Sequence, residues 1–315
     1  AGDTHGNLAL LGDKFMYFSP NKRAFIMYGI SGNSWVSMGD PVGDPAEFKE
    51  LIWQFREMSH EHYDRVVFYE VGTEYLPYYI DLGLSIFKIG EEARVPLNVF
   101  SLQGNSKKSL RSNQNRMEKE GYSFEVIAAD QVSASLDIFK RISDDWLREK
   151  NTKEKRFSLG FFNEKYLSEG PVAVVRNKND IVAFANLWTG MGVKEMSVDL
   201  MRYMPDHAKG TMDFLFVKLM DWGKQHGYEW FNLGMAPFSG IEERSLSTLW
   251  NRLGYLVYRF GEHFYNFKGL RNYKDKFDPV WTPRYLVYPG GILFPVILTN
   301  IAALISGGLK GVVSK

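Results

Sequence analysis

The stretch SVDLMRYMPDHAKGTMDFLFVKLMDWGKQHGYEWFNLGMAPFS, residues 197–239, decides how the second half of the chain folds. Its apolar pattern predicts a strand ending near Leu200, then a loop, a helix over residues 210–227 and a strand over 229–233. Asp199 and Arg202 stand where the first strand ends. A carboxylate and a guanidinium at such a strand end are a candidate catalytic pair, and a surface ion pair is the alternative reading.

The same layout occurs in the first half of the chain. Short apolar runs separated by turn formers predict a β-meander, followed by a helix to about His60 and a buried strand over residues 65–71. The runs of this meander are residues 8–11, 15–18, 24–30 and 35–38. In the second half, strands over 172–175, 181–188 and 195–200 precede the helix over 210–227. Two halves with one layout predict a duplicated α/β fold, with mixed sheets flanked by helices.

A basic helix is predicted over residues 105–121, between the two halves. It has few apolar anchors, which is typical of a connector, and its cations suit the phosphates of a nucleic acid. A solvated linker helix is the alternative. The cations are Lys107, Lys108, Arg111, Arg116 and Lys119. The predicted domains are 1–103, the connecting helix 104–121, a catalytic domain 122–291 and an apolar C-terminal helix 292–315.

The composition of the chain excludes several kinds of functional site. A chain of 315 residues is long enough for two domains, and its net charge of +1 gives no sign of a surface that is basic throughout. The absence of Cys excludes disulfides, thiolate nucleophiles and Cys-based zinc sites. The six His residues show no metal-ligand spacing, so we expect no metal.

Several long strings carry a resemblance to a known family. They are FIMYG, GDPVGDP, SVDLMRY, GTMDFLF, FNLGMAPFSG, GEHFYNFKGLRNYKDKFDPVW and PRYL. They resemble the cytoplasmic catalytic domain of the aminoacyl-phosphatidylglycerol synthases, the multiple peptide resistance factor family. The resemblance covers nearly the whole chain. It implies tandem GNAT acyltransferase-like domains joined by the basic helix.

The resemblance also implies a reaction. Such enzymes transfer an aminoacyl group, usually lysyl or alanyl, from aminoacyl-tRNA to the glycerol hydroxyl of phosphatidylglycerol. The product lowers the negative charge of the membrane and confers resistance to cationic antimicrobial peptides. We expect Lys-tRNA as donor, an N-terminal transmembrane flippase region as partner, and a place at the cytoplasmic face of the bacterial cell membrane. A Fem-like transferase acting on a peptidoglycan precursor and a non-catalytic membrane-surface module remain alternatives.

The loop over residues 204–210 separates this chain from ordinary GNAT acetyltransferases. Those proteins place a glycine-rich phosphate loop before their central helix, where backbone N–H groups cradle the pyrophosphate of acetyl-CoA. The loop here reads MPDHAKG and lacks that pattern. We therefore expect no acetyl-CoA and no other cofactor.

Site residues follow from the residue types and the resemblance. Asp199 would orient the attacking hydroxyl, and Arg202 would hold the lipid phosphate. Glu262 and His263 are further catalytic candidates, with a structural reading as the alternative. The candidates for binding lipid or the aminoacyl group are Tyr203, Glu242, Glu243, Tyr265, Lys268, Arg271 and Lys274. Glu242 and Glu243 could instead favour a helix N-terminus, and the cations after Phe267 could be a solvated face.

The apolar tail, residues 292–309, has two readings. It could pack on the domain as a core helix. It could also lie in the membrane interface with its apolar side chains inserted. The inserted residues would then be Phe294, Ile297, Leu298, Ile301 and Leu304.

Overall fold

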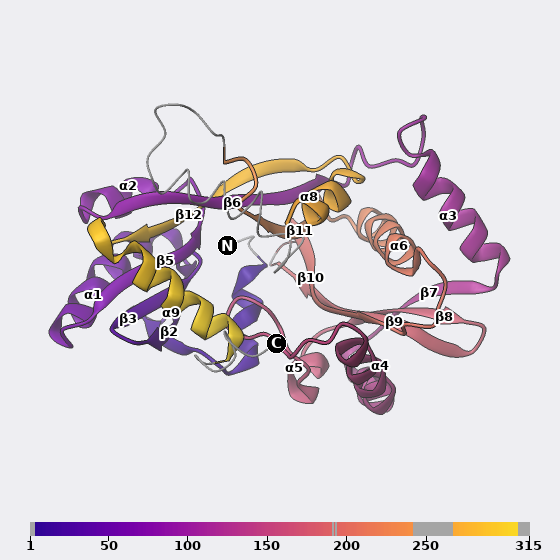
Figure 1. Cartoon of the computed structure of the whole chain (residues 1–315), viewed down its shortest axis with the longest axis horizontal. Helices are drawn as coiled ribbons and strands as arrows, with labels where there is room; N and C mark the ends of the chain where they lie inside the picture. The colour runs from indigo at the N-terminus through magenta and orange to yellow at the C-terminus, as the bar shows by residue number, and fades with distance from the viewer. Residues whose placement is uncertain (1–3, 191, 193, 242–266, 308–315) are drawn as a thin grey trace. The chain divides into compact units, whose positions relative to one another are not determined.

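The computed structural model describes residues 4–190, 192, 194–241 and 267–307 (Figure 1). The chain forms two compact units, and each is discontinuous in sequence. The first consists mainly of residues 12–94 and 233–313, and the second mainly of 2–11 and 95–232. The chain enters the second unit within β6 (Ser85–Pro96) and leaves it within β11 (Trp230–Pro237). The sequence instead predicts four consecutive segments.

The first unit is built on a mixed sheet with the strand order β1-β2-β3-β5-β12-β6. The pair β3–β5 is parallel, and the other neighbouring pairs are antiparallel. A short strand, β4, pairs with β2. The bounds are β1 Phe15–Phe18, β2 Ala24–Ser31, β3 Ser34–Met38, β4 Val42–Gly43, β5 Arg65–Val71 and β12 Val280–Tyr288. Because β12 pairs with β5 and β6, the C-terminal segment belongs to this unit.

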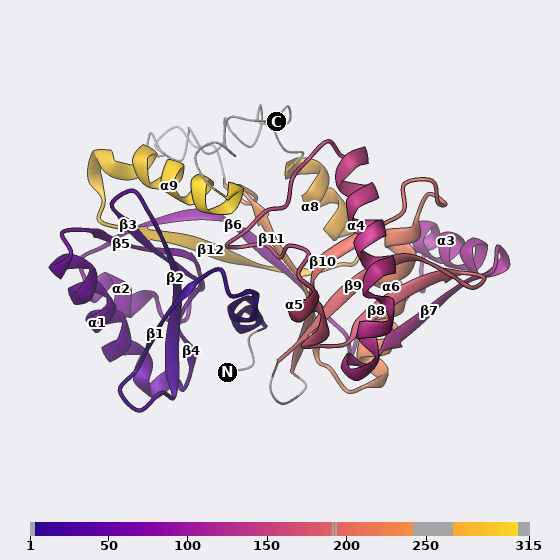
Figure 2. The ribbon, with the colours of Figure 1, turned by 90° about the horizontal axis from the view of Figure 1, so that it is seen from below.

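Helices cover both faces of this sheet. Figure 2 shows α1 (Phe48–Glu61) and α2 (Leu76–Asp81) on one face and α9 (Phe294–Ser306) on the other. The 3₁₀ helix η2 (Pro45–Glu47) leads into α1, and η5 (Gly291–Leu293) leads into α9. Helix α8 (Phe267–Asp275) precedes β12. Phe55, Phe68 and Tyr79 are fully buried in the core under α1.

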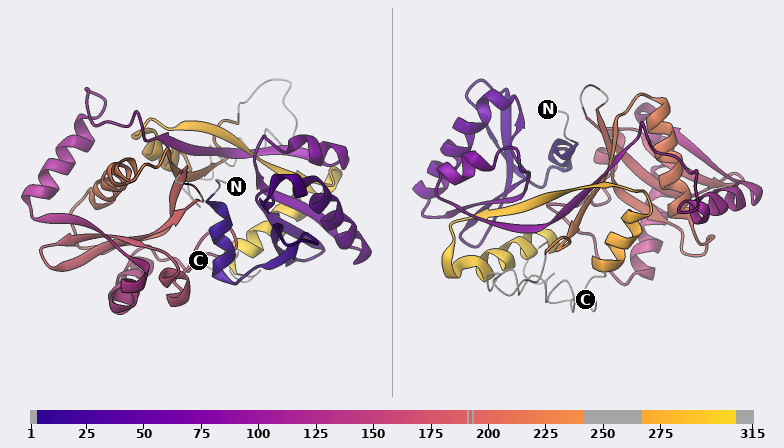
Figure 3. Two further views of the ribbon diagram at one scale, coloured as in Figure 1. Left: turned by 180° about the vertical axis from the view of Figure 1, so that it is seen from behind. Right: turned by 90° about the horizontal axis from the view of Figure 1, so that it is seen from above.

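The second unit has the strand order β11-β10-β9-β8-β7, in which only β10–β11 is a parallel pair. Its other strands are β7 Tyr122–Ile127, β8 Val172–Asn177, β9 Asp180–Thr189 and β10 Glu195–Tyr203. Figure 1 shows α6 (Thr211–Gln225) on one face, and α4 (Leu136–Glu149) and α5 (Glu164–Ser168) on the other. Helix α3 (Lys108–Lys119) packs beside α6 (Figure 3), and the 3₁₀ helix η3 (Ala129–Ser135) leads into α4.

The predicted fold class, mixed sheets flanked by helices in an α/β architecture, is confirmed. The strand predicted over 65–71 has the bounds of β5, and the helix predicted over 210–227 contains α6. One predicted strand is wrong. Residues 8–11 are not a meander strand but part of the 3₁₀ helix η1 (His5–Leu11). Leu8 and Leu11 are both buried, which fits a repeat of three residues per turn.

The apolar tail packs on the first unit. Phe294, Ile297 and Ile301 are buried, and Asn300 donates a hydrogen bond to the hydroxyl of Ser34 at 2.9 Å. Insertion of these three apolar side chains into a membrane is therefore wrong for this structure, because α9 uses them to cover the sheet. Ile292, by contrast, is 90% exposed. Among the described residues, no helix has the length and apolar content to cross a bilayer.

Candidate active site

Asp199 lies at an irregularity of β10. The register between β9 and β10 shifts between Val198 and Met201, so this strand carries a bulge there. The backbone N–H of Leu200 has left the ladder and donates to the side-chain oxygen of Asn186 at 2.8 Å. Bulges of this kind re-aim side chains next to functional sites. The predicted end of this strand near Leu200 is wrong, because β10 continues to Tyr203 and Asp199 lies inside it. Sequence reasoning also missed the bulge and Asn186.

Two donors fix the Asp199 carboxylate. The backbone N–H of Gly160 donates to Oδ1 at 2.8 Å, and the hydroxyl of Tyr166 donates to Oδ2 at 2.6 Å. The indole N–H of Trp188 in turn donates to the Tyr166 oxygen at 2.6 Å. Burial and the neighbouring carboxylate raise the pKa of Tyr166 well above its ordinary value, so the phenol stays protonated and keeps donating.

Gly160 also makes room for this carboxylate. A Cβ atom at position 160 would lie 1.7 Å from Asp199 Oδ2, which no packing adjustment of a few tenths of an ångström could relieve. The glycine is therefore required by the close approach of the Asp199 side chain to its backbone. The nearby sequence SLGFF gave no signal of this contact.

Arg202 has different partners from Asp199. Its Nη2 donates to Glu154 Oε2 at 3.0 Å, and its guanidinium carbon lies 4.2 Å from the ring centroid of Trp146. The Arg202 side chain is 12% exposed, so it is not part of a surface ion pair. Burial lowers the pKa of Arg202, and the carboxylates of Glu154 and Asp199 oppose that shift. A guanidinium remains charged in such a site.

The residue after Arg202, Tyr203, lies beside a lysine of the same unit. Tyr203 is partly buried, and the ammonium of Lys150 lies 5.6 Å from its ring centroid. A hydrogen bond with Tyr203 is the main cause that raises the pKa of Lys150. An oriented carboxylate, a largely buried guanidinium and an ammonium thus lie on and beside one strand.

The first unit holds a carboxylate built in the same way. Asp40 follows β3 and accepts from the N–H of Gly72 at 2.7 Å and from the hydroxyl of Tyr79 at 2.8 Å. Arg284 lies next to this centre and forms an ion pair with Glu92. Each unit thus has an Asp held by a glycine N–H and a buried tyrosine, beside an Arg that pairs with a Glu. The parallel supports a duplicated fold, and the sequence did not single out Asp40.

The predicted substrate-binding cations of α8 have different environments. Lys274 is buried and donates to the carbonyl oxygens of Gly234 and Met235, both at 2.9 Å. Burial lowers its pKa to about 7, although Glu92 and Glu70 oppose the shift. Arg271 forms an ion pair with Glu91 and lies 4.2 Å from the Trp281 ring centroid, whereas Lys268 is exposed.

The predicted tRNA-binding cations of α3 do not form one exposed stripe. Lys107 is buried, and Arg111 donates to the carbonyl oxygens of Leu102 and Gly104. Arg116 is exposed but pairs with Glu120, while Lys108 and Lys119 are exposed. A tRNA contact by this helix stays a prediction, for which Lys108, Arg116 and Lys119 are the exposed cations.

Five predicted site residues have no structural account. They are Glu242, Glu243, Glu262, His263 and Tyr265, and they lie outside the described residues. No cluster of three or more potential metal ligands occurs in the part of the chain that the structure describes.

Solved structures share this fold. The chain superposes on a C-terminal domain (DUF2156) from Agrobacterium fabrum with a TM-score of 0.88 and 44% identity, covering 99% of this chain and 95% of that one. L-PGS from Bacillus licheniformis matches with a TM-score of 0.85 and 38% identity, over 96% and 93% of the two chains. FemX shares the fold alone, with a TM-score of 0.57 and 10% identity.

A curated relative and a family model agree with these structures. The phosphatidylglycerol lysyltransferase of Bacillus subtilis is 38% identical over 310 residues, which are 98% of this chain and 36% of the relative. The chain thus spans about a third of the length of such relatives. The family model described as phosphatidylglycerol lysyltransferase, C-terminal, matches residues 1–288. Since that match covers most of its length, the chain belongs to the family of phosphatidylglycerol lysyltransferase C-terminal domains.

Proposed function

We propose that this chain transfers an aminoacyl group, with lysyl favoured, from aminoacyl-tRNA to the glycerol hydroxyl of phosphatidylglycerol. The observation that carries the proposal is the Asp199 centre, in which two donors orient a carboxylate beside Arg202. Membership of the family supports the lipid and the lysyl group, because the relatives are named phosphatidylglycerol lysyltransferases.

The reaction is a transesterification. The lipid hydroxyl oxygen attacks the carbonyl carbon of the aminoacyl ester and forms a new ester bond. The bond to the ribose oxygen of the tRNA breaks, and the proton of the lipid hydroxyl ends on that ribose oxygen. Because the ester is already activated, positioning of the hydroxyl and partial acceptance of its proton supply most of the required catalysis.

Asp199 suits the positioning task. Hydrogen bonds from Gly160 and Tyr166 stabilise the ionised carboxylate, which makes it a weak base with a fixed direction. Each carboxylate oxygen can accept more than one hydrogen bond, so the lipid hydroxyl can be a further donor. Asp199 therefore acts by orienting the nucleophile and by stabilising its developing positive charge.

Arg202 suits an anionic group of either substrate. Glu154 and the ring of Trp146 hold the guanidinium in one place, which limits the reorganisation needed when a phosphate or oxyanion arrives. Its buried Nε donor has no hydrogen-bond partner among the described residues. Arg202 would thus fix the phosphate of the lipid or stabilise the tetrahedral oxyanion.

The cellular setting is part of the same proposal. A membrane-spanning flippase region of a longer protein would hold this chain at the cytoplasmic face of the bacterial membrane. Lysylation would add positive charge to phosphatidylglycerol and so weaken the attraction of cationic antimicrobial peptides.

A transfer assay tests the function. The chain is incubated with [¹⁴C]Lys-tRNA and vesicles that contain phosphatidylglycerol, and the lipid fraction is counted. We expect label in the lipid, and a loss of about 10²-fold or more with Asp199→Asn. Asp206→Asn, an exposed neighbour on the following loop, is the control and should retain transfer. Label appearing only in a peptidoglycan precursor would favour the Fem-like reaction, and no label from any aminoacyl-tRNA would refute a transferase.

A further inference from the structure

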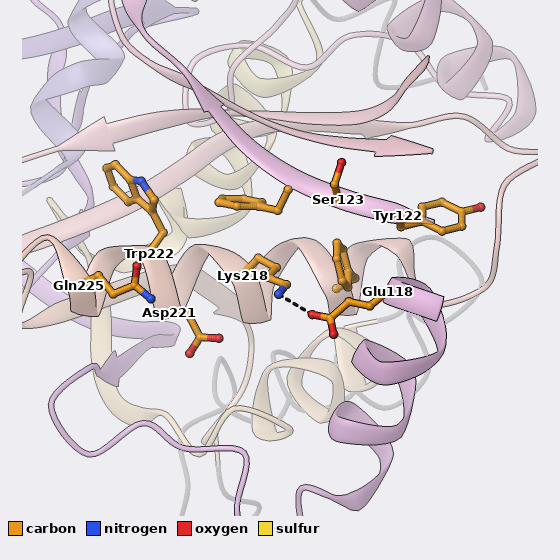
Figure 4. A pocket seen from close by; sticks show the side chains of 9 residues that line it. Glu118, Tyr122, Ser123, Lys218, Asp221, Trp222 and Gln225 are labelled. Atoms are coloured by element: carbon orange, nitrogen blue, oxygen red, sulfur yellow. Dashed lines mark hydrogen bonds and ion pairs between the residues drawn. The ribbon is translucent and has the colours of Figure 1, made fainter. Parts of the chain in front are cut away.

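The second unit contains a cavity that the proposed transfer site does not use. It lies between α3, β7 and α6 and has a volume of about 400 Å³. That volume falls within the range of small-molecule sites, roughly 300–1,000 Å³. Figure 4 shows Lys218, Asp221, Trp222 and Gln225 on one helix and Tyr122 and Ser123 on the strand across from it.

One face of α6 supplies most of the wall. Phe214, Lys218, Asp221, Trp222 and Gln225 recur at helical spacing and all line the cavity. Leu215, Leu219 and Met220 lie on the buried face of the same helix. The face toward the cavity thus carries polar side chains beside its aromatic rings, whereas the core face is apolar. The strand adds the ring of Phe124, and α3 adds Glu118.

Asp221 is the unusual group in this wall. It is half-buried, and no other described residue forms a hydrogen bond or ion pair with its carboxylate. Burial raises its pKa, although Lys218 and Lys224 oppose the shift. Lys218 itself is engaged, since it pairs with Glu118 at 2.6 Å. A partly desolvated carboxylate beside aromatic rings is costly unless a ligand uses it.

The side chains that line the cavity indicate which class of ligand it can bind. Aromatic walls favour a planar ring, and the Asp221 carboxylate requires hydrogen-bond donors on the edge of that ring. The nearby ammonium groups of Lys218 and Lys224 disfavour a cationic ligand and therefore favour a neutral donor. A guanine offers two adjacent N–H groups to a carboxylate and a carbonyl oxygen that the Gln225 amide can reach as donor.

The residues around the cavity suit the phosphate backbone of a nucleic acid. Lys119 ends α3, and Lys178 approaches Gly121, with its Cγ 4.0 Å from the position of a Cβ on that glycine. Gly121 directly precedes Tyr122 of the cavity wall. Both lysines are exposed and can contact phosphates on either side of a base held in the cavity.

We propose that the cavity between α3, β7 and α6 binds one unpaired nucleobase of an RNA, with guanine as the best match, through Asp221, Gln225 and the neighbouring rings. The identity of that RNA as the donor tRNA rests on the proposed function. The base contact positions the RNA at a distance from Asp199 and takes no part in the chemical step.

Binding of short RNAs tests the cavity without any transfer reaction. Fluorescently labelled pentamers, with uridines flanking a central G, A, C or U, are titrated with the chain and followed by anisotropy. We expect the central G to bind best, and Asp221→Asn to weaken that pentamer about tenfold while affecting the uridine pentamer little. Binding of the G pentamer should also weaken as the pH falls and Asp221 protonates, and Asp221→Asn should remove this dependence.

Two further variants keep the test decisive. Asp137→Asn changes an exposed carboxylate on α4 of the same unit and should bind like the wild type. Gln225→Ala, at an exposed position, should weaken the G pentamer even if Asp221→Asn fails to fold. Equal binding of the four pentamers by the wild type, or unchanged G binding in folded Asp221→Asn and Gln225→Ala, would overturn the proposal.

The transfer assay then separates this site from the function. Asp221→Asn should raise the KM for aminoacyl-tRNA about tenfold with an unchanged kcat, because the contact is remote from the chemistry. Wild-type transfer with an unaltered KM in Asp221→Asn would remove the cavity from the tRNA site and leave the transferase intact. An absence of transfer by the wild type would refute the proposed function, while the pentamer titrations would still decide the cavity.

Discussion

Replacement of Tyr166 by Phe tests whether the direction of the Asp199 carboxylate matters. The change removes one oxygen that does two things in the structure. It donates to Asp199 Oδ2 at 2.6 Å and accepts from the Trp188 indole at 2.6 Å. Gly160 remains as a donor to Asp199, so the carboxylate keeps that anchor.

The expected loss in the free energy of unfolding follows from these two hydrogen bonds. A hydrogen bond to a charged group contributes about 1.5–3 kcal/mol to stability, and a buried donor left without an acceptor costs about 1–3 kcal/mol. Because one hydroxyl serves both bonds, the two terms overlap, and we expect a loss of about 2–4 kcal/mol in the free energy of unfolding. The ring of Tyr166 still fills its site, so the unit should fold.

The pH profile of transfer gives the decisive readout. With one donor fewer, the ionised form of Asp199 is less stabilised, so its pKa rises. The acid limb of kcat/KM against pH should therefore move to higher pH. The measurement uses aminoacyl-tRNA and phosphatidylglycerol vesicles, with thermal unfolding of the same sample.

The first unit offers a matched control. Tyr79→Phe removes an equivalent hydrogen bond, from the buried Tyr79 hydroxyl to Asp40 at 2.8 Å. It should cost a comparable amount of stability without moving the acid limb. A folded Tyr166→Phe variant with the wild-type pH profile and kcat would refute the reasoning, as would an equal shift in both variants.

Three further predictions concern packing and charge. Gly160→Ala should destabilise the second unit by about 1–3 kcal/mol and abolish transfer, because its Cβ would displace the Asp199 carboxylate; wild-type activity would contradict that steric argument. Lys274 has a pKa lowered from 10.5 to about 7, so the unfolded chain binds more protons between these values. Stability should accordingly rise with pH across that window, and denaturant midpoints of Lys274→Met should lack this contribution; parallel pH curves for the two proteins would exclude it. Asn300→Leu should lower the free energy of unfolding by about 1–2 kcal/mol, because it leaves the buried Ser34 hydroxyl without its donor, and denaturant titration checks this.

The sequence by itself determined most of the local elements and the family. Helix α6 was predictable because its apolar residues recur with the period of a helix, and strand β5 because it is a short, mostly apolar run of the buried type. Asp199 and Arg202 were identified from the contiguous string SVDLMRY and its family resemblance, which needs no tertiary information, although β10 continues past both residues to Tyr203. The long strings that carry the family resemblance are likewise contiguous, so they needed no tertiary information.

Only the tertiary structure decided which residues contact Asp199 and Arg202. Gly160 and Tyr166 reach Asp199 from the segment around α5, and Glu154 reaches Arg202 from the loop after α4. No spacing rule relates these positions, because they meet only when α4, α5 and β10 pack together. The assignment of β12 to the first unit has the same origin, in its pairing with β5 and β6.

Burial of charge was also decided by the fold. Lys107 and Lys274 read as surface cations in sequence, and both are buried. A long polar side chain carries no periodic signal of its own burial, since the carbonyl oxygens that accept from Lys274 belong to a distant strand. The residue types therefore fixed which chemistry is available, and the three-dimensional arrangement fixed which of those groups can face a substrate.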